Sequence, residues 1–186
     1  MTNPVLRYIT GRGGSGTGGL SAYLSKLAED YSVLPVNAQF LGRDLQDQIN
    51  CVRNFTTSRS THVIANSYGA YLFLLSLIAQ PSSPIRVLLL SPVLGRAMDK
   101  ERMLFSRPPR EASLKRAISD MNLGQVQHLE ILTGEDDEVC DPNLARTIGQ
   151  KLNIPVTVLK GQGHMLEQRS VAIAVDTFLS IGQPKR

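Results

Sequence analysis

The sequence contains few cysteines and little charge, and each shortage excludes a class of protein. Cys51 and Cys140 are the only cysteines in 186 residues. Two cysteines are too few for a disulfide framework, and neither lies in a metal-ligand pattern, so we expect no metal and no cofactor. Charged residues make up 19% of the chain and the formal net charge is +4. Without a long basic block, this charge argues against nucleic acid as a partner.

Long hydrophobic runs are also missing. No segment reaches the ~18 uninterrupted apolar residues that a membrane span requires. The N-terminus has no basic region followed by a long apolar stretch, as a secretory signal would have. We therefore expect a soluble, cytoplasmic protein that does not contact a membrane.

Apolar residues make up 42% of the chain, which suits one compact domain over residues 1–186. Short β-branched or apolar runs alternate with longer helical patterns, which is typical of β-α-β units that build a parallel sheet. We expect an α/β fold, a three-layer sandwich of about six mostly parallel strands with helices on both faces. The expected strands are 6–10, 33–38, 61–66, 85–90, 128–132 and 155–159. The expected helices are 19–30, 45–57, 68–80, 110–121, 142–152 and 166–180.

The connection over residues 92–126 is longer than the others and contains one good helical pattern. Its first part, 95–109, mixes methionine, leucine and phenylalanine with arginine and lysine. Long insertions of this kind often form lids, so a small cap over the site is one interpretation. An amphipathic surface helix that covers the sheet edge is the other.

The junction at Ser67 carries the main chemical signal, because a strand pattern ends there and an apolar helical pattern begins at once. Ala65 and Gly69 are small residues two places before and after the serine. A nucleophile elbow needs small residues at these places, because strand and helix crowd together around the serine. A serine before a helix can also be an ordinary N-cap.

Two later loops supply a possible acid and base. Asp137 follows the fifth expected strand in GEDDEV at 134–139, and His164 follows the sixth in GQGH at 161–164. Both lie at the carboxyl ends of strands, where open α/β sheets build their sites. We take Asp137 as the acid and His164 as the base. Asp136 remains an alternative acid, because the loop holds several carboxylates.

With ANSYG at 65–69 and these two loops, the sequence resembles the small, nearly cap-free serine esterases of the α/β-hydrolase superfamily. The order Ser67, Asp137, His164 is the order of that superfamily's catalytic triad. The resemblance implies hydrolysis of a small ester, thioester or amide through an acyl-enzyme, and we expect a short-chain carboxylic ester. It also implies an oxyanion hole formed by the backbone N–H groups of Tyr68 and Arg12, with Gly13 as a substitute for Arg12.

Two other functions stay open. Gly11, Gly13 and Gly16 follow a strand and precede a helix in the spacing of a dinucleotide-binding loop. That fingerprint also expects an acidic residue at the end of the second strand, where 36–40 offers none. The third possibility is a catalytically silent interaction protein built on the hydrolase fold.

Overall fold

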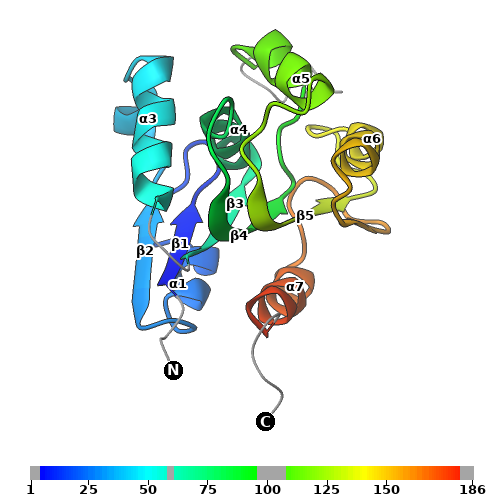
Figure 1. Cartoon of the computed structure of the whole chain (residues 1–186). Helices are drawn as coiled ribbons and strands as arrows, with labels where there is room; N and C mark the ends of the chain where they lie inside the picture. Colours follow the sequence, from blue (N-terminus) through cyan, green and yellow to red (C-terminus); the bar gives the residue numbers. More distant parts are fainter. Residues whose placement is uncertain (1–4, 58–60, 96–107, 181–186) are drawn as a thin grey trace.

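The computed structural model describes residues 5–57, 61–95 and 108–180, which form one sheet with helices on both faces (Figure 1). The strands are β1 (Val5–Ile9), β2 (Asp30–Leu34), β3 (Thr61–Asn66), β4 (Ser83–Leu90), β5 (Val126–Gly134) and β6 (Val156–Leu159). The helices are α1 (Gly19–Leu24), α2 (Ala38–Leu41), α3 (Leu45–Thr56), α4 (Ser67–Ser76), α5 (Glu111–Ser119), α6 (Pro142–Leu152) and α7 (Gln168–Ser180).

The strands lie in the order β2-β1-β3-β4-β5-β6, and every pairing between them is parallel. The chain first moves outward from β1 to β2 and then crosses back to place β3 on the other side of β1. Ile9 and Ala65 are register partners at the ends of β1 and β3. The loop after β1 and the start of α4, which directly follows β3, therefore lie side by side at the point where the strand order reverses. Open α/β sheets bind ligands at this point.

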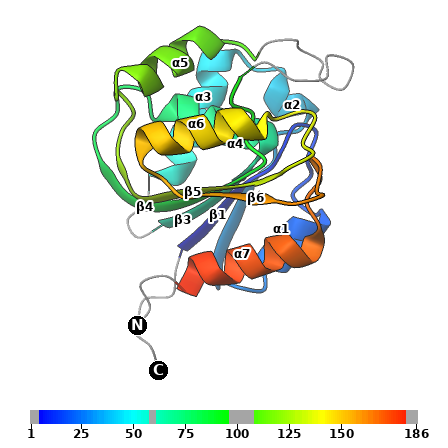
Figure 2. The ribbon, with the colours of Figure 1, turned by 90° about the vertical axis from the view of Figure 1, so that its right-hand side faces the viewer.

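Each face of the sheet is covered by its own set of helices, as Figure 2 shows. Helices α1 and α7 lie on one face, and α2 to α6 lie on the other. Each face has its own hydrophobic core. Helix α4 is buried from Tyr68 to Ser76, which confirms that its nearly uniform apolar sequence marks an interior helix.

The predicted fold class is therefore confirmed: the chain forms a three-layer α/β sandwich. The possible cap at 95–109 falls mainly on residues 96–107, which lie outside the described residues. Among the helices that the structure describes, none has both the length and the apolar character needed to cross a bilayer.

The second strand was predicted too late in the chain, at 33–38 instead of Asp30–Leu34. Pro35 follows the strand directly, and proline has no N–H to donate to a neighbouring strand. Asn37 then caps α2, because its side chain accepts a hydrogen bond from the Phe40 N–H at 2.9 Å. Val36 therefore lies between the strand and the helix, and Ala38 belongs to the short helix α2.

The first helix was predicted too long, at 19–30, and ends at Leu24. The chain must turn after this residue in order to enter β2 at Asp30. The Asp30 carboxylate accepts a hydrogen bond from the guanidinium of Arg7, on β1, at 2.8 Å. This tertiary pairing overrides the local helical pattern.

Three basic side chains lie in a row beneath α7, far from the loops described below. His62, Arg86 and His128 are register partners on β3, β4 and β5. The ring of Phe178, on α7, meets the His62 ring edge to face at 5.5 Å. Burial, and then the nearby Arg86, lower the pKa of His62 below its ordinary value. The His128 ring lies 3.2 Å from the carboxylate of Glu130.

The lowered pKa of His62 predicts that the folded protein loses stability in mild acid. Because the pKa of His62 is lower in the folded chain, the unfolded chain binds a proton there first as the pH falls. The stabilisation is complete above the unfolded pKa of about 6.5 and is lost below it. We expect His62→Leu to flatten the fall in the free energy of unfolding between about pH 7 and pH 5, measured by urea denaturation. Identical pH slopes for variant and parent would contradict this.

Candidate active site

The junction of β3 and α4 contains no intervening residue. Ser67, the first residue of α4, has a φ of 50°, in the left-handed region that residues with side chains rarely adopt. A Cβ atom on Gly69 would lie 2.8 Å from Cγ2 of Ile9 and against the carbonyl oxygen of Thr10. Only glycine fits there. The junction thus has the strained and crowded geometry of a nucleophile elbow.

The hydroxyl of Ser67 is directed toward an imidazole. Its Oγ lies 3.0 Å from Nε2 of His164. The N-cap of α4 is Asn66, whose side chain makes no capping hydrogen bond. The carbonyl oxygen of Ser67 accepts a hydrogen bond from the Val93 N–H at 3.2 Å. The arrangement therefore differs from an ordinary serine N-cap.

The carboxylate beside His164 belongs to Asp137, on the loop after β5. Nδ1 of His164 lies 3.1 Å from each oxygen of this carboxylate. Oδ1 of Asp137 also accepts hydrogen bonds from the N–H groups of Val139 and Cys140, at 2.9 and 2.8 Å. Asp137 is only 2% exposed, so these donors replace the water that a buried charge loses.

Asp136, the alternative acid, is exposed on the same loop. Its backbone N–H donates to the carbonyl oxygen of Gln162 at 2.9 Å. Of these two aspartates, Asp137 is the one whose carboxylate contacts the imidazole.

The loop that carries His164 is held against the end of β5 by close backbone contact. A Cβ atom on Gly134 would overlap the carbonyl oxygen of Gln162, so glycine is required at this position. The Gln162 side chain donates to Oγ of Ser170 at 2.9 Å and accepts from the Glu167 N–H at 3.0 Å. These contacts fasten the loop both to β5 and to the start of α7.

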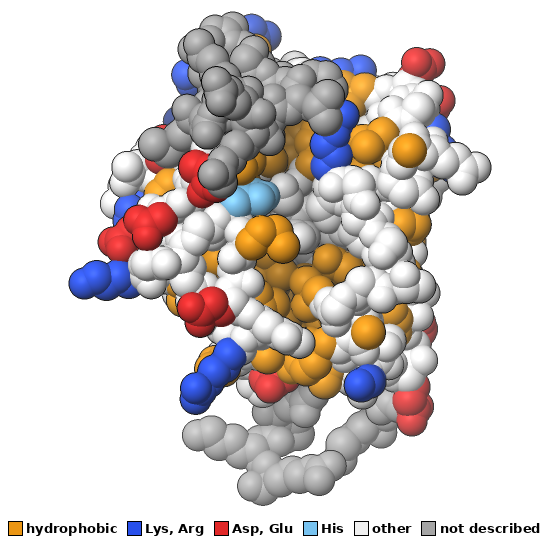
Figure 3. All heavy atoms as spheres, turned by 180° about the vertical axis from the view of Figure 1, so that it is seen from behind, with side chains coloured by type: hydrophobic (Ala, Val, Ile, Leu, Met, Phe, Trp, Pro, Cys, Tyr) orange, Lys and Arg blue, Asp and Glu red, His pale blue; other side chains and the backbone are white. Residues whose placement is uncertain are grey.

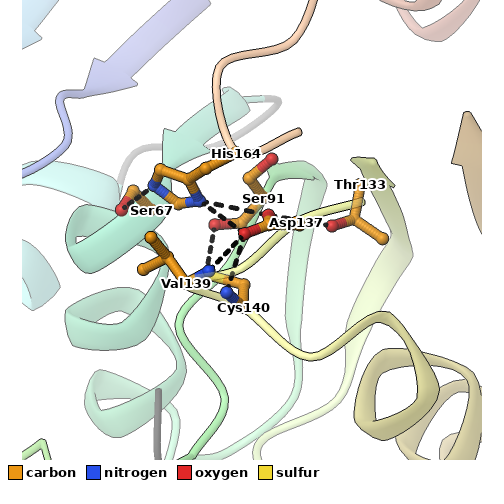
Figure 4. A network of polar contacts seen from close by, with 7 residues as sticks. All are labelled: Ser67, Ser91, Thr133, Asp137, Val139, Cys140 and His164. Carbon is orange, nitrogen blue, oxygen red and sulfur yellow. Dashed lines mark hydrogen bonds and ion pairs between the residues drawn. The ribbon is translucent and has the colours of Figure 1, made fainter. Parts of the chain in front are cut away.

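Figure 4 shows the resulting chain of contacts, from Ser67 through His164 to Asp137. Three segments separated by 97 and 27 positions supply them. Thr133 adds a hydroxyl that donates to Oδ2 of Asp137 at 3.4 Å. Chemically, such an arrangement can remove a proton from a serine hydroxyl while a fixed carboxylate orients the base.

The candidate oxyanion donors are the backbone N–H groups of Tyr68, Arg12 and Gly13. The N–H of Tyr68 is in the first turn of α4, where the helix supplies no acceptor. On the loop after β1, the Gly13 N–H donates to the carbonyl oxygen of Val36 at 2.8 Å. Gly13 is therefore not the substitute donor in this geometry, which leaves Arg12 as the candidate on this loop.

Thr10 holds the loop after β1 in place, and sequence reasoning missed it. Its hydroxyl donates to the carbonyl oxygen of Gly11 at 3.1 Å and accepts from the Val36 N–H at 2.8 Å. A Cβ atom on Gly14 would lie 2.6 Å from Cβ of Thr10. No local sequence signal marks this role of the threonine, because the bond that joins the loop to the rest of the fold comes from Val36, after β2.

Contacts within the protein account for glycines on the loop after β1, whose spacing resembles that of a dinucleotide-binding loop. Gly14 packs on Thr10, and a Cβ atom on Gly16 would lie 3.0 Å from Cγ1 of Val33. The Gly14 N–H donates to the carbonyl oxygen of Gly11 at 2.9 Å. Both N–H groups of the Gly13-Gly14 pair are thus used inside the protein and not directed at a pyrophosphate.

One group of side chains has the composition of a metal site. Asp137, Cys140 and His164 each offer a ligand atom, and these atoms lie within 4.8 Å of one another. Burial, and then the charge of Asp137, raise the pKa of the Cys140 thiol well above its ordinary value. The thiol instead donates to the carbonyl oxygen of Ser91 at 3.1 Å. A protonated thiol is a poor metal ligand, so we assign no metal here.

A hollow of about 530 Å³ opens beside His164, between the loop after β1, α1 and the start of α7. Its lining includes Asn66, the residue before Ser67. Figure 3 shows hydrophobic side chains gathered around a hollow next to a histidine on this face of the molecule. Its volume lies within the ordinary range for small-molecule sites.

Comparisons with protein-family models and with curated proteins found no match. Solved structures resemble this one over nearly its whole length. The ydeN gene product from B. subtilis is 19% identical, with a TM-score of 0.64 over 94% of this chain and 98% of its own. Esterase PE8 is 14% identical, with a TM-score of 0.66 over 96% and 92%. A monoacylglycerol lipase from Paleococcus ferrophilus is 12% identical, with a TM-score of 0.65 over 95% of both chains.

These identities are low, so the likeness establishes the fold. Another similar structure, at 14% identity and a TM-score of 0.63, is described as an alpha/beta hydrolase enzyme. The chain has the α/β-hydrolase fold.

The crowding at the elbow predicts a large effect of one methyl group. Gly69→Ala would force its Cβ against Thr10 and Ile9, so we expect a loss of about 1–3 kcal/mol in the free energy of unfolding. Gly19→Ala is the matched control, because a Cβ atom on that helical glycine meets nothing within 4 Å. Urea denaturation measures both. Equal stability of the two variants would contradict the close approach.

Proposed function

We propose that this protein is a serine hydrolase that cleaves a small carboxylic ester through an acyl-enzyme. Ser67 is the nucleophile, His164 the general base and Asp137 the residue that orients it. The proposal rests on one observation above all, the unbroken chain of contacts from the Ser67 hydroxyl through both ring nitrogens of His164 to a buried carboxylate. A small ester-like molecule is the expected partner, with neither cofactor nor nucleic acid.

In the first step, Oγ of Ser67 attacks the ester carbonyl carbon while Nε2 of His164 takes the hydroxyl proton. The carbonyl electron pair moves to oxygen and forms a tetrahedral intermediate. When this collapses, the bond to the alcohol breaks, and the imidazolium returns its proton to the departing oxygen. Water then attacks the acyl-enzyme by the same route. Asp137 stabilises the imidazolium without accepting its proton.

The backbone N–H groups of Tyr68 and Arg12 would stabilise the negative oxygen of the intermediate. The first belongs to the residue after the nucleophile, and the second to the loop after β1 that Thr10 holds in place. Fixed donors of this kind cost no reorganisation when charge develops, and each contributes about 3 kcal/mol to transition-state stabilisation.

The names of the similar structures support hydrolysis. They include an esterase, a monoacylglycerol lipase and a membrane phospholipase A. Thioesters and amides follow the same chemical route, so the bond cleaved is the open part of the proposal. A silent interaction protein would keep this fold and lack the reactivity, which makes reactivity the decisive test.

The nucleophile is tested with a fluorophosphonate probe, which reacts with activated serines. We expect the native protein to be labelled, with mass spectrometry locating the label on Ser67. Ser67→Ala should abolish both labelling and ester hydrolysis while the melting temperature changes by only a few degrees. A native, folded protein that neither reacts with the probe nor hydrolyses any ester, thioester or amide would favour the silent alternative.

The acid is tested with two neighbouring aspartates. We expect Asp137→Asn to lower kcat by a factor on the order of 10⁴, because the amide no longer holds the imidazole in the required tautomer. Asp136→Asn is the matched control, since this exposed carboxylate lies on the same loop, and it should leave kcat within about twofold. Steady-state hydrolysis of a nitrophenyl ester measures both. The reverse order of effects would assign the acid to Asp136.

A further inference from the structure

The hollow between α1 and α7 has a volume of about 530 Å³, which is larger than a short acyl group requires. Apolar side chains form much of its wall. We propose that it binds an uncharged, apolar acyl chain, so that the preferred substrate is an ester of a carboxylic acid longer than acetic acid. This inference rests on the proposed function and names the substrate class of the same site.

The hollow begins at the reacting groups and leads away from them. Gly11, Asn66 and His164 line one end. Asn66 directly precedes Ser67, and a Cβ atom on Gly11 would lie 3.3 Å from Cβ of Ser67. From there the lining continues to Leu20 on α1 and to Val171 on α7. A group bonded to the Ser67 hydroxyl thus has a path into the space between the two helices.

Apolar side chains form much of the wall. Leu20 comes from α1 and Leu90 from the end of β4. The others come from the segment that leads into α7 and from α7 itself: Met165, Leu166 and Val171. Met165 directly follows His164 and is 86% exposed, although large apolar side chains usually avoid water. An apolar ligand that covers Met165 would remove this apolar surface from water, which favours binding.

Several polar side chains of the wall already have partners within the protein. The Thr10 hydroxyl bonds to Gly11 and Val36, and the Tyr8 hydroxyl bonds to the Asn66 side chain.

Two polar side chains on α1 are satisfied in the same way. Ser21 donates to the carbonyl oxygen of Gly16 at 2.6 Å. The hydroxyl of Tyr23 donates to the carboxylate of Asp176 at 2.8 Å. An entering group therefore finds these hydrogen bonds already made, and burial of apolar surface is what remains to hold it.

Fixed charge is nearly missing from the hollow. Among the described residues that line it, Arg12 is the one with a permanent charge. Its guanidinium carbon lies 6.0 Å from the centre of the Tyr68 ring. Arg12 lies on the loop after β1, and the lining supplied by α1, the end of β4 and the segment 164–171 holds no permanent cation. A carboxylate placed among those apolar side chains would lose its water, which favours an uncharged acyl chain there.

The acyl side of the ester fits this space better than the alcohol side. The acyl group remains bonded to Ser67 through both steps, whereas the alcohol must leave and water must reach His164. A walled hollow can hold the part that stays without blocking the exchange of alcohol for water.

The test is a series of nitrophenyl esters that share one leaving group and differ in acyl length from two to eight carbons. We expect kcat/KM to rise about three- to fourfold for each added methylene until the hollow is filled, because each methylene leaves water. A matched ester with a terminal carboxylate on the acyl chain should be a poorer substrate than the uncharged ester of equal length.

Filling the hollow should remove this preference. Leu20 and Leu166 are only partly buried, so Leu20→Trp and Leu166→Trp should fold and place an indole in the acyl path. We expect the ratio of kcat/KM for the octanoyl ester to kcat/KM for the acetyl ester to fall at least tenfold in both variants. Ile173→Trp is the matched control, because Ile173 lies on α7, is 58% exposed and is not part of the lining.

The result separates the two proposals. Fluorophosphonate labelling of Ser67 in all three variants would show that the triad and the fold are intact. With labelling retained, a flat acyl-length profile, a preference for acidic chains, or a length dependence that follows the alcohol would overturn the acyl hollow alone. Failure of both labelling and hydrolysis in the parent protein would overturn the proposed function itself.

Discussion

Close backbone contact at the ends of β1 and β5 is the constraint on which the site depends. Gly69 allows α4 to approach the end of β1, and Gly134 allows the loop of Gln162 to lie on the end of β5. Any side chain at either position would separate segments that must touch. The first contact sets the direction of the Ser67 hydroxyl, and the second sets the position of His164. The distances between the side chains of Ser67, His164 and Asp137 depend on these two approaches.

The buried charge of Asp137 adds an electrostatic constraint to the steric one. Two backbone N–H groups and the imidazole surround this carboxylate, so its charge is balanced by fixed dipoles in place of water. A carboxylate held in this way cannot turn away from the ring without leaving a charge uncompensated. The hollow beside the ring differs, since several of its polar side chains are bonded within the protein and apolar side chains form much of its wall. The hydrogen-bonded side chains of Ser67, His164 and Asp137 and the mainly apolar hollow thus lie next to each other at one edge of the sheet.

Much of the fold could be predicted because its signals are local and strong. The apolar residues at 63–65 and 70–75 predict a buried strand directly before a buried helix, and the structure confirms both. The prediction was wrong at β2 and α1, where the pattern is weak. Pro35 ended the strand early, and the pairing of Arg7 with Asp30 fixed where the strand begins. An edge strand has one neighbour and partial exposure, so its sequence is less constrained than that of a central strand.

The sequence by itself determined the residue types that can do chemistry and the order in which they follow strands. Ser67, Asp137 and His164 stand out because each follows a strand of a parallel sheet, and such loops gather at one edge. Tertiary structure decided which of two adjacent aspartates meets the imidazole, which loop N–H groups are already bonded, and that Thr10 supports the loop after β1. It also formed the hollow, whose walls come from residues 8–23, 66, 90 and 164–171. Distances between side chains far apart in sequence depend on how the helices pack on the sheet, and no local pattern encodes that packing.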